Sequence, residues 1–134
     1  MVEMNDTLQS VSRPDPRLWL GRTVTMETDR PIGYTHTKSG HTFTYPINYG
    51  FIPGVLGGDG EELDVYLLGV DRPVERFTGV IIGAVVRTDD EEDKLVMAPA
   101  GMHCTADEIR TAVDFQERYH MSYILTAAEA NFKN

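Results

Sequence analysis

Four acidic side chains crowd into six residues directly after a glycine-rich turn. The segment Tyr45–Asp64 reads YPINYGFIPGVLGGDGEELD, with two tyrosines and an asparagine ahead of the carboxylates of Asp59, Glu61, Glu62 and Asp64. Aromatic hydroxyls and an amide can hydrogen-bond a polar ligand, and carboxylate oxygens are the hard ligands that Mg²⁺, Mn²⁺ and Ca²⁺ select. The segment does not match an EF-hand loop. We interpret it as a metal site that handles an anion, with a solvated acidic turn as the alternative.

A second acidic run, Asp89–Asp93, directly precedes Lys94. Such runs at hairpin tips are usually solvated. On a strand that enters at Lys94, however, alternation would place Glu92 and Lys94 on one face and Asp93 and Leu95 on the other. This arrangement would present a carboxylate and an ammonium side by side to a metal–phosphate ligand.

A third polar group lies late in the expected helix, in the segment Phe115–His120, FQERYH. Tyr119 could donate a hydrogen bond to a phosphate, and His120 could add partial positive charge. The helical pattern alone would make Tyr119 a core residue and His120 a surface residue, so both interpretations stay open.

Several short strands and one helix are expected to position these groups. Alternating or β-rich segments bounded by turn residues predict strands at Arg22–Thr28, Thr42–Tyr45, Leu63–Val70, Phe77–Arg87 and Leu95–Ala98. Thr105 and Glu108 have the spacing of a capping box, which predicts a helix that begins at Thr105. Short strands followed by one C-terminal helix favour a mainly β, α+β fold, a small barrel with an appended helix.

The chain is expected to form one domain, because 134 residues suffice for a self-supporting core. Residues 1–17 are polar, carry Pro14 and Pro16, and predict a flexible N-terminal arm. Residues 18–134 are expected to form a single barrel domain, which Trp19 and Leu20 anchor at its start.

Composition and charge exclude several classes of partner. The formal net charge of −9 repels nucleic-acid backbones, and we see no basic patch that would overcome it. No apolar run approaches the roughly 20 residues that cross a bilayer, and the N-terminus lacks a secretory apolar region. Cys104 is the single cysteine and is interpreted as a packed or idle thiol, so a cytoplasmic location is expected. The expected partner is a small-molecule phosphate; a homo-oligomer is compatible with the sequence, which leaves the oligomeric state open.

Four segments resemble, in the same order, motifs of the soluble (family I) inorganic pyrophosphatases. Tyr45–Ile52 is similar to YPxNYGYI, Asp59–Val65 to DGDPxDV, Thr88–Pro99 to TDE…DxKLVxVP, and Phe115–His120 to FxExYK. The collinear match runs from about Val24 to Tyr123, and four ordered motifs are far more specific than one. The resemblance implies an OB-like five-stranded β-barrel. It also implies an inorganic diphosphatase that hydrolyses pyrophosphate to two phosphates with Mg²⁺ and an activated water, Mn²⁺ or Co²⁺ being substitutes.

The resemblance also implies roles for individual residues. Metal ligands are expected at Asp59, Asp64, Asp89 and Glu92, with Asp93 as a substitute for Glu92 and Asp90 as an acidic neighbour. Glu61 stands where the family has the aspartate that activates the attacking water. The expected catalytic residues are therefore Glu61, Asp64 and Lys94, and the expected phosphate contacts are Tyr49, Lys94, Tyr119 and His120.

The departures from the family mainly remove positive charge. The helical lysine is His120, and both a Lys-x-Glu pair and a phosphate-binding arginine are absent from their usual places. The local candidates to replace this cationic clamp are Arg30, His36 and Lys38.

Two other functions therefore stay open. The depleted clamp favours a catalytically weak module that binds a metal–phosphate or a nucleotide. The same depletion could leave room for a larger substrate, which would make the protein a hydrolase of another phosphoanhydride. The retained acidic residues favour the pyrophosphate-hydrolysing enzyme.

Overall fold

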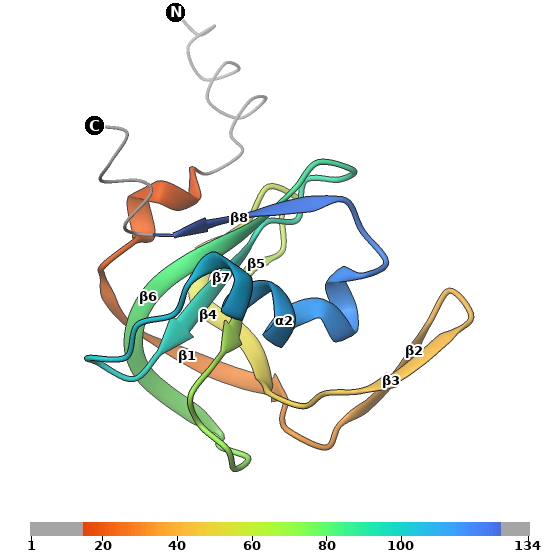
Figure 1. Cartoon of the computed structure of the whole chain (residues 1–134), viewed down its shortest axis with the longest axis horizontal. Coiled ribbons are helices and arrows are strands. Elements are labelled where there is room, and N and C mark those ends of the chain that lie inside the picture. Colours follow the sequence, from red (N-terminus) through yellow and green to blue (C-terminus); the bar gives the residue numbers. More distant parts are fainter. Residues whose placement is uncertain (1–14, 127–134) are drawn as a thin grey trace, which may run out of the picture.

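A computed structural model describes residues 15–126 of the chain. Its elements are η1 (Pro16–Trp19), β1 (Thr23–Arg30), β2 (Thr35–Lys38), β3 (His41–Thr44), β4 (Asn48–Leu56), β5 (Glu62–Leu67), β6 (Arg76–Arg87), β7 (Lys94–Ala98), α2 (Ala106–Glu117) and β8 (Ser122–Thr126). Five strands follow the order β1-β4-β5-β7-β6, and β6 pairs back with β1 to close a barrel, while β8 extends the sheet beyond β6 (Figure 1). The expected α+β fold, a five-stranded barrel with a C-terminal helix, is confirmed.

The barrel interior is filled by alternate side chains of its strands, as a closed sheet requires. Fully buried members include Met26 on β1, Val65 and Leu67 on β5, and Leu95 and Met97 on β7. Trp19 and Leu20 pack against this cluster, in agreement with their expected role as an anchor. The long strand β6 shifts register between Ile81 and Gly83, which bends it around the barrel.

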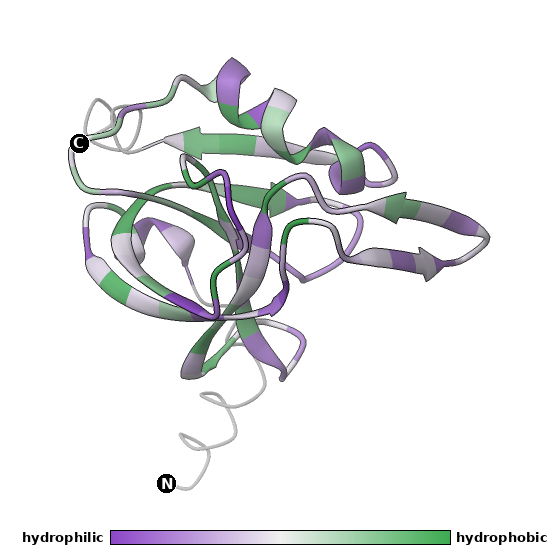
Figure 2. Ribbon diagram, turned by 90° about the horizontal axis from the view of Figure 1, so that it is seen from below, coloured by the Kyte–Doolittle hydropathy of each residue, from purple (hydrophilic) through white to green (hydrophobic). Residues whose placement is uncertain are grey.

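A second buried cluster lies between the barrel wall and α2. Ile109 and Val113, one helical turn apart, pack with Tyr45, Tyr49 and Tyr66 of the preceding segments. The helix begins as predicted: Thr105 Oγ1 accepts from the Glu108 amide at 3.1 Å, and Glu108 Oε1 accepts from the Thr105 amide at 2.8 Å. Figure 2 shows α2 and β8 together along one side of the barrel.

The strands β2 and β3 form a separate two-stranded sheet that projects from the barrel (Figures 1 and 2). Its turn residues Ser39 and Gly40 both have positive φ, 53° and 82°, as the tight hairpin turn that suits twisted strands requires. Hydroxyl pairs across the hairpin join Thr35 to Thr44 at 3.1 Å and Thr37 to Thr42 at 2.9 Å. This hairpin brings its histidines and Lys38 to the end of α2.

Several boundaries differ from the prediction. Strands β2, β4 and β8 were not predicted, and β4 occupies the segment interpreted as leading into a glycine-rich turn. The helix ends at Glu117, so Tyr119 and His120 follow it instead of lying within it. Most of the expected N-terminal arm lies outside the described residues, and Pro16 and Arg17 begin η1. Among residues 15–126, no helix has the length and apolar character needed to cross a membrane.

Candidate functional site

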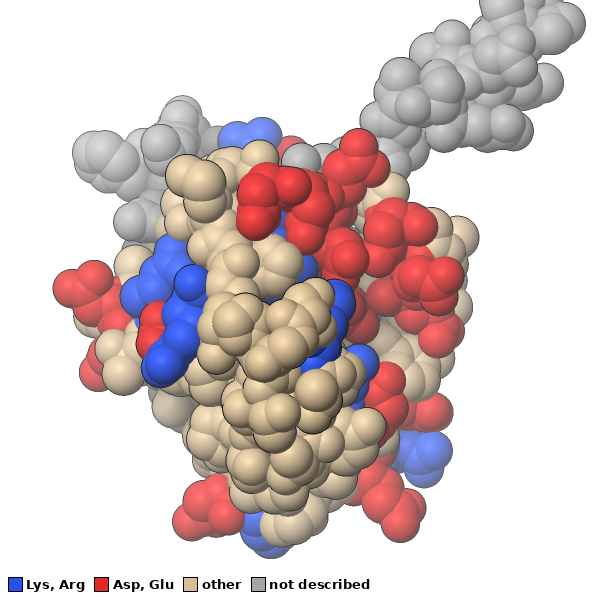
Figure 3. All heavy atoms as spheres, turned by 90° about the vertical axis from the view of Figure 1, so that its right-hand side faces the viewer, with Lys and Arg blue, Asp and Glu red and all other residues tan. Residues whose placement is uncertain are grey.

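A pocket of about 290 Å³ opens where the barrel, the β2–β3 hairpin and the end of α2 meet. Its acidic and basic lining consists of three carboxylates (Asp29, Asp64, Glu92), four permanent cations (Arg30, Lys38, Arg87, Lys94) and three histidines (His36, His41, His120). Figure 3 views the face that carries the hairpin, where acidic side chains gather at the upper right and blue Lys and Arg side chains flank the central tan surface. The lining thus carries one more permanent cation than carboxylate in a protein of formal charge −9, and this local balance favours an anionic ligand.

Lys94 lies at the floor of this pocket between two carboxylates. Its Nζ donates to Asp64 Oδ2 at 2.7 Å and to Glu92 Oε1 at 3.1 Å, and it lies 5.6 Å from the centre of the Tyr49 ring. Burial alone would lower the pKa of Lys94, but Tyr49 and the Asp64 carboxylate outweigh burial and raise the pKa above its ordinary value. Asp64 and Glu92 therefore already converge on one cation.

The alternation expected around Lys94 is present in the structure. Glu92 and Lys94 contact each other on the pocket face, whereas Asp93 Oδ1 accepts from the Arg87 amide at 3.2 Å and is buried. Of these two carboxylates, Glu92 is thus the one that faces the pocket.

Glu92 should make stability depend on pH. Its burial raises the pKa of the carboxyl, but the charge and hydrogen bond of Lys94 lower it more, so the pKa lies below the ordinary 4.5. A carboxyl with a depressed folded pKa contributes stability above its unfolded pKa and loses it as the pH falls through the folded pKa. We expect Glu92→Gln to be less stable than the parent at pH 7 and nearly equal to it at pH 3, in urea denaturation with EDTA. A difference that is constant across this range would contradict the assignment.

Arg87, at the end of β6, is a buried cation that the sequence did not single out. Its side chain is 3% exposed, and its Nε and Nη2 donate to Glu117 Oε1 and Oε2 at 3.1 and 2.8 Å. Its Nη1 lies 3.3 Å from Asp90 Oδ2 and 3.8 Å from Glu92 Oε1. One side of the guanidinium is thus bound to the helix and the other is turned toward the acidic β6–β7 turn.

A buried chain of hydrogen bonds joins Arg87 to Arg30 on the far side of the pocket. Glu117 accepts from the Tyr66 hydroxyl at 2.6 Å, which itself accepts from Gln116 Nε2 at 2.7 Å. The Tyr45 hydroxyl donates to Gln116 Oε1 and accepts from Arg30 Nη1 at 2.7 Å. We call this set the arginine network; its members are Arg30, Tyr45, Gln116, Tyr66, Glu117 and Arg87.

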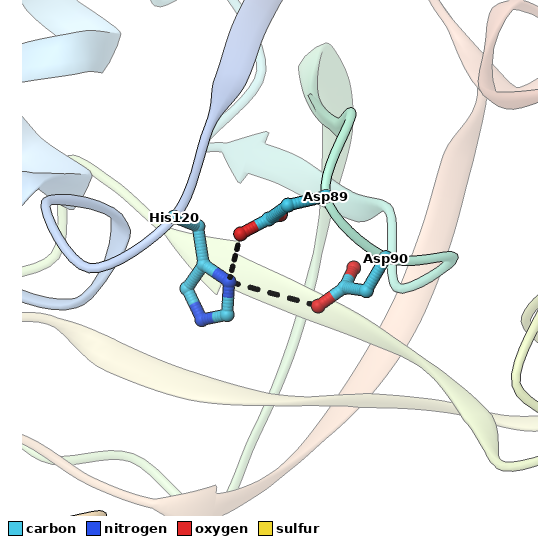
Figure 4. A group of neighbouring side chains, drawn as sticks. All are labelled: Asp89, Asp90 and His120. Carbon is cyan, nitrogen blue, oxygen red and sulfur yellow. Dashed lines mark hydrogen bonds and ion pairs between the residues drawn. The ribbon is translucent and has the colours of Figure 1, made fainter.

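Two aspartates and a histidine meet beside the pocket (Figure 4). His120 Nδ1 lies 3.2 Å from Asp89 Oδ2 and 3.6 Å from Asp90 Oδ2. One ligand atom from each residue lies within 4.8 Å of the others, a spacing that could hold a metal ion. Since His120 also lines the pocket, this group borders the same space as Asp64 and Glu92.

Most of the residues expected at the site do line the pocket: Arg30, Lys38, Tyr49, Asp64, Glu92, Lys94, Tyr119 and His120. Asp89 does not line it but contacts His120. Asp59 and Glu61 are exposed in the β4–β5 turn, where Asp59 Oδ1 accepts from the Glu61 amide at 3.0 Å, and neither lines the pocket. The structure thus brings Asp64 together with residues of the Asp89–Lys94 and Phe115–His120 segments, but it does not bring the turn that precedes Asp64 to the pocket.

The motif around Tyr45 differs from its initial interpretation. The Tyr45 hydroxyl bonds to Arg30 and Gln116 within the arginine network and does not remain for a ligand. Asn48 is fully buried. The Asn48 amide accepts from Ile32 and Val74 amides and donates to the Arg72 carbonyl, so it joins two loops instead of facing a ligand. Tyr49, by contrast, lines the pocket, and burial raises the pKa of its hydroxyl, which keeps it a neutral donor.

Six lining residues were not predicted from the sequence: Asp29, Ser39, His41, Phe43, Arg87 and Gln116. His41 stacks on Tyr119 with ring centroids 4.1 Å apart and so joins the hairpin to the end of α2. Arg87 ends an apolar strand, and Gln116 sits on an amphipathic helix, so each has a local pattern that also fits an ordinary surface position. A polar residue at a buried helical position was the signal that could have pointed to Gln116.

Comparisons with known proteins agree with this geometry. A family model described as inorganic pyrophosphatase matches residues 20–127. The inorganic pyrophosphatases of Neisseria meningitidis serogroup A and Haemophilus influenzae are each 40% identical to the chain, over 83 and 79 residues. These matches cover 57% and 54% of this chain but 45% and 43% of the relatives, so the chain spans about half the length of the curated relatives it matches.

A solved inorganic pyrophosphatase from Ehrlichia chaffeensis superposes with a TM-score of 0.61 at 17% identity and covers 91% of this chain and 95% of that one. The Helicobacter pylori enzyme gives a TM-score of 0.59 at 16% identity, over 91% and 92% of the two chains. At these identities the likeness shows the fold, and the family model, which spans most of the chain, shows the relationship. The chain therefore belongs to the inorganic pyrophosphatase family.

Proposed function

We propose that this chain hydrolyses inorganic pyrophosphate to two phosphates with the help of divalent cations. The observation that carries the proposal is the pocket in which Arg30, Lys38, Arg87 and Lys94 face the same space as Asp64 and Glu92. Cations alone would bind a phosphate compound; carboxylates placed among them add the means to bind metal. Membership of the family supports this combination.

The donor set fits hard divalent cations. Asp64 and Glu92 already converge on the Lys94 ammonium, and Asp89, Asp90 and His120 offer a second group of ligand atoms. We propose Mg²⁺ as the metal because carboxylate oxygens dominate, with Mn²⁺ or Co²⁺ as substitutes that also accept the imidazole nitrogen. When bound, such cations neutralise the phosphoryl oxygens and acidify a water molecule.

The chain's own side chains are proposed to supply the remaining contacts to the phosphoryl groups. Lys94, which Asp64 and Glu92 now hold, is proposed to contact the leaving phosphate once those carboxylates have another cation. Tyr49 and Tyr119 are proposed hydrogen-bond donors to phosphoryl oxygens, and Arg30, Lys38 and His120 are proposed to add positive charge. These interactions would favour the transition state by charge stabilisation and alignment.

Two acidic residues of the β4–β5 turn keep roles that rest on their motif positions. We propose Asp59 as a further metal ligand and Glu61 as the acceptor of the proton from the attacking water. Both are exposed and outside the pocket lining, so their variants should be compared with Asp64→Asn.

Phosphate release by the metal-stripped protein tests the proposal. With Mg²⁺ added back, we expect pyrophosphate turnover within the usual enzyme range, about 1–10³ s⁻¹, and slower or no release from ATP and sugar nucleotides. Asp64→Asn should lower the rate at least about 100-fold. Asp114→Asn, which removes a carboxylate paired with Arg118 on the surface of α2, is the control and should leave it unchanged. Equal rates for Asp64→Asn and the parent would refute the assignment.

A second candidate is a module that binds a metal–phosphate compound without turnover. It is favoured by one observation, that Asp59 and Glu61 do not line the pocket. Tight Mg²⁺-dependent binding of pyrophosphate with no phosphate release would establish this alternative. Faster release from ATP than from pyrophosphate would instead favour a hydrolase of another phosphoanhydride.

A further inference from the structure

We propose that Arg87 is a substrate-binding residue whose Nη1 donates to a phosphoryl oxygen. The inference rests on the proposed function and deepens it, because it supplies a cation for the clamp whose usual arginine is missing from the sequence. It concerns a position that none of the four motifs includes. Arg87 is the last residue of β6 and directly precedes Thr88, where the third motif begins.

Glu117 fixes the orientation of the Arg87 guanidinium. Nε and Nη2 bind the two oxygens of Glu117, which is fully buried and also accepts from Tyr66. This two-point contact uses one edge of the planar group and leaves Nη1 on the opposite side. A side chain held in this way loses little conformational freedom when it binds a ligand.

The Nη1 atom of Arg87 is turned toward the pocket and its accessible carboxylates. Arg87 lines the same pocket as Lys94, and its Nη1 contacts Asp90 and Glu92 at 3.3 and 3.8 Å. These two carboxylates are 31% and 34% exposed, whereas Glu117 is 0% exposed. The guanidinium therefore has a permanent partner inside the protein and two accessible partners at the pocket.

The accessible partners of Arg87, Asp90 and Glu92, belong to the proposed metal-binding residues. Lys94 and Arg87 share Glu92, and His120 and Arg87 share Asp90. If Glu92 and Asp90 bind divalent cations, their electrostatic attraction for Nη1 becomes weaker. The Nη1 hydrogens then become available to an anion, while Glu117 keeps the guanidinium in place. A planar guanidinium suits phosphate oxygens better than an ammonium does.

A binding experiment on two variants with the same Glu117 substitution isolates this role. Glu117→Gln and Arg87→Met/Glu117→Gln differ only in Arg87, and neither leaves a buried carboxylate without a cation. The probe is methylenediphosphonate, a pyrophosphate analogue that cannot be hydrolysed, titrated calorimetrically into each folded protein at saturating Mg²⁺. Titration of Mg²⁺ alone gives the metal affinity of each variant.

We expect the variant without Arg87 to bind methylenediphosphonate about 10- to 100-fold more weakly than Glu117→Gln, as for a lost hydrogen bond to a charged group. The Mg²⁺ affinities of the two should differ less than about 3-fold. A purely structural Arg87 predicts equal affinities for the analogue in both variants, and this result would overturn the inference.

A third variant covers the case in which the double variant does not fold. Arg87→Lys keeps a charge for Glu117, but its ammonium has no second edge for the anion, so affinity for the analogue should again fall, by at least about 5-fold. Unchanged affinity would overturn the inference. Failure of the proposed function is recognised separately: the parent protein would then release no phosphate from pyrophosphate, whatever the behaviour of the Arg87 variants.

Discussion

Arg87→Met should lower the free energy of unfolding by about 3–5 kcal/mol, one of the two largest effects that we expect. The guanidinium and the Glu117 carboxylate are 3% and 0% exposed and form a two-point ion pair at 2.8 and 3.1 Å. Removal of the cation leaves the carboxylate in a place that water does not reach. The large loss thus arises from an uncompensated buried charge and not from the intrinsic strength of the ion pair.

A double variant separates these two causes. Arg87→Met/Glu117→Gln should recover most of the loss and lie within about 2 kcal/mol of the parent, because the neutral amide can still accept from Tyr66. Urea denaturation followed by circular dichroism, with EDTA present, gives the three free energies. Arg118→Met is the matched control: its ion pair with Asp114 is 58% and 45% exposed, and its loss should stay below about 1 kcal/mol. Equal destabilisation of the single and double variants would assign the cost to packing.

Local patterns predicted the parts of the fold whose causes are local. The capping box at Thr105 and the apolar run Phe77–Arg87 gave a helix and a strand that begin within one residue of the observed ones. Strand β4 was not recognised, because Gly50, Pro53 and Gly54 interrupt the residue pattern typical of strands. Its identity depends on pairing with β5 and with β1, and β1 is separated from β4 in the sequence by the β2–β3 hairpin.

The residues of the candidate site show the same difference between local patterns and long-range contacts. Alternation placed Glu92 beside Lys94, since both belong to one short segment. The partner of Arg87, by contrast, lies 30 residues further along the chain, and no local pattern marks Arg87 as buried. The acidic residues can therefore be recognised from the sequence, in which the cationic clamp looks depleted, whereas the folded pocket gathers cations from β1, β2, β6 and β7.

Gly50→Ala should disturb the pairing of β1 with β4 and lower the free energy of unfolding by at least about 3 kcal/mol. Gly50 pairs with Thr28, directly beside the register shift of β1 that separates Thr28 from Arg30. A Cβ at Gly50 would lie 1.8 Å from the Glu27 carbonyl oxygen, 2.7 Å from its carbon and 2.8 Å from Thr28 Cα. All three atoms belong to backbone within a paired strand, so no side-chain rotation can relieve the overlap.

The glycine of the YPINYG segment is thus required by the close approach of β1 to β4, and this approach also brings Arg30 and Asp29 to the pocket beside Tyr49. Gly57→Ala is the matched control, because a Cβ there meets its nearest atoms at an ordinary 3.6 Å and its loss should stay below about 1 kcal/mol. Chemical denaturation of both variants provides the comparison. If Gly50→Ala proved as stable as Gly57→Ala, β1 would have to be free to move away from β4, and Arg30 would then not be held at the pocket by the barrel.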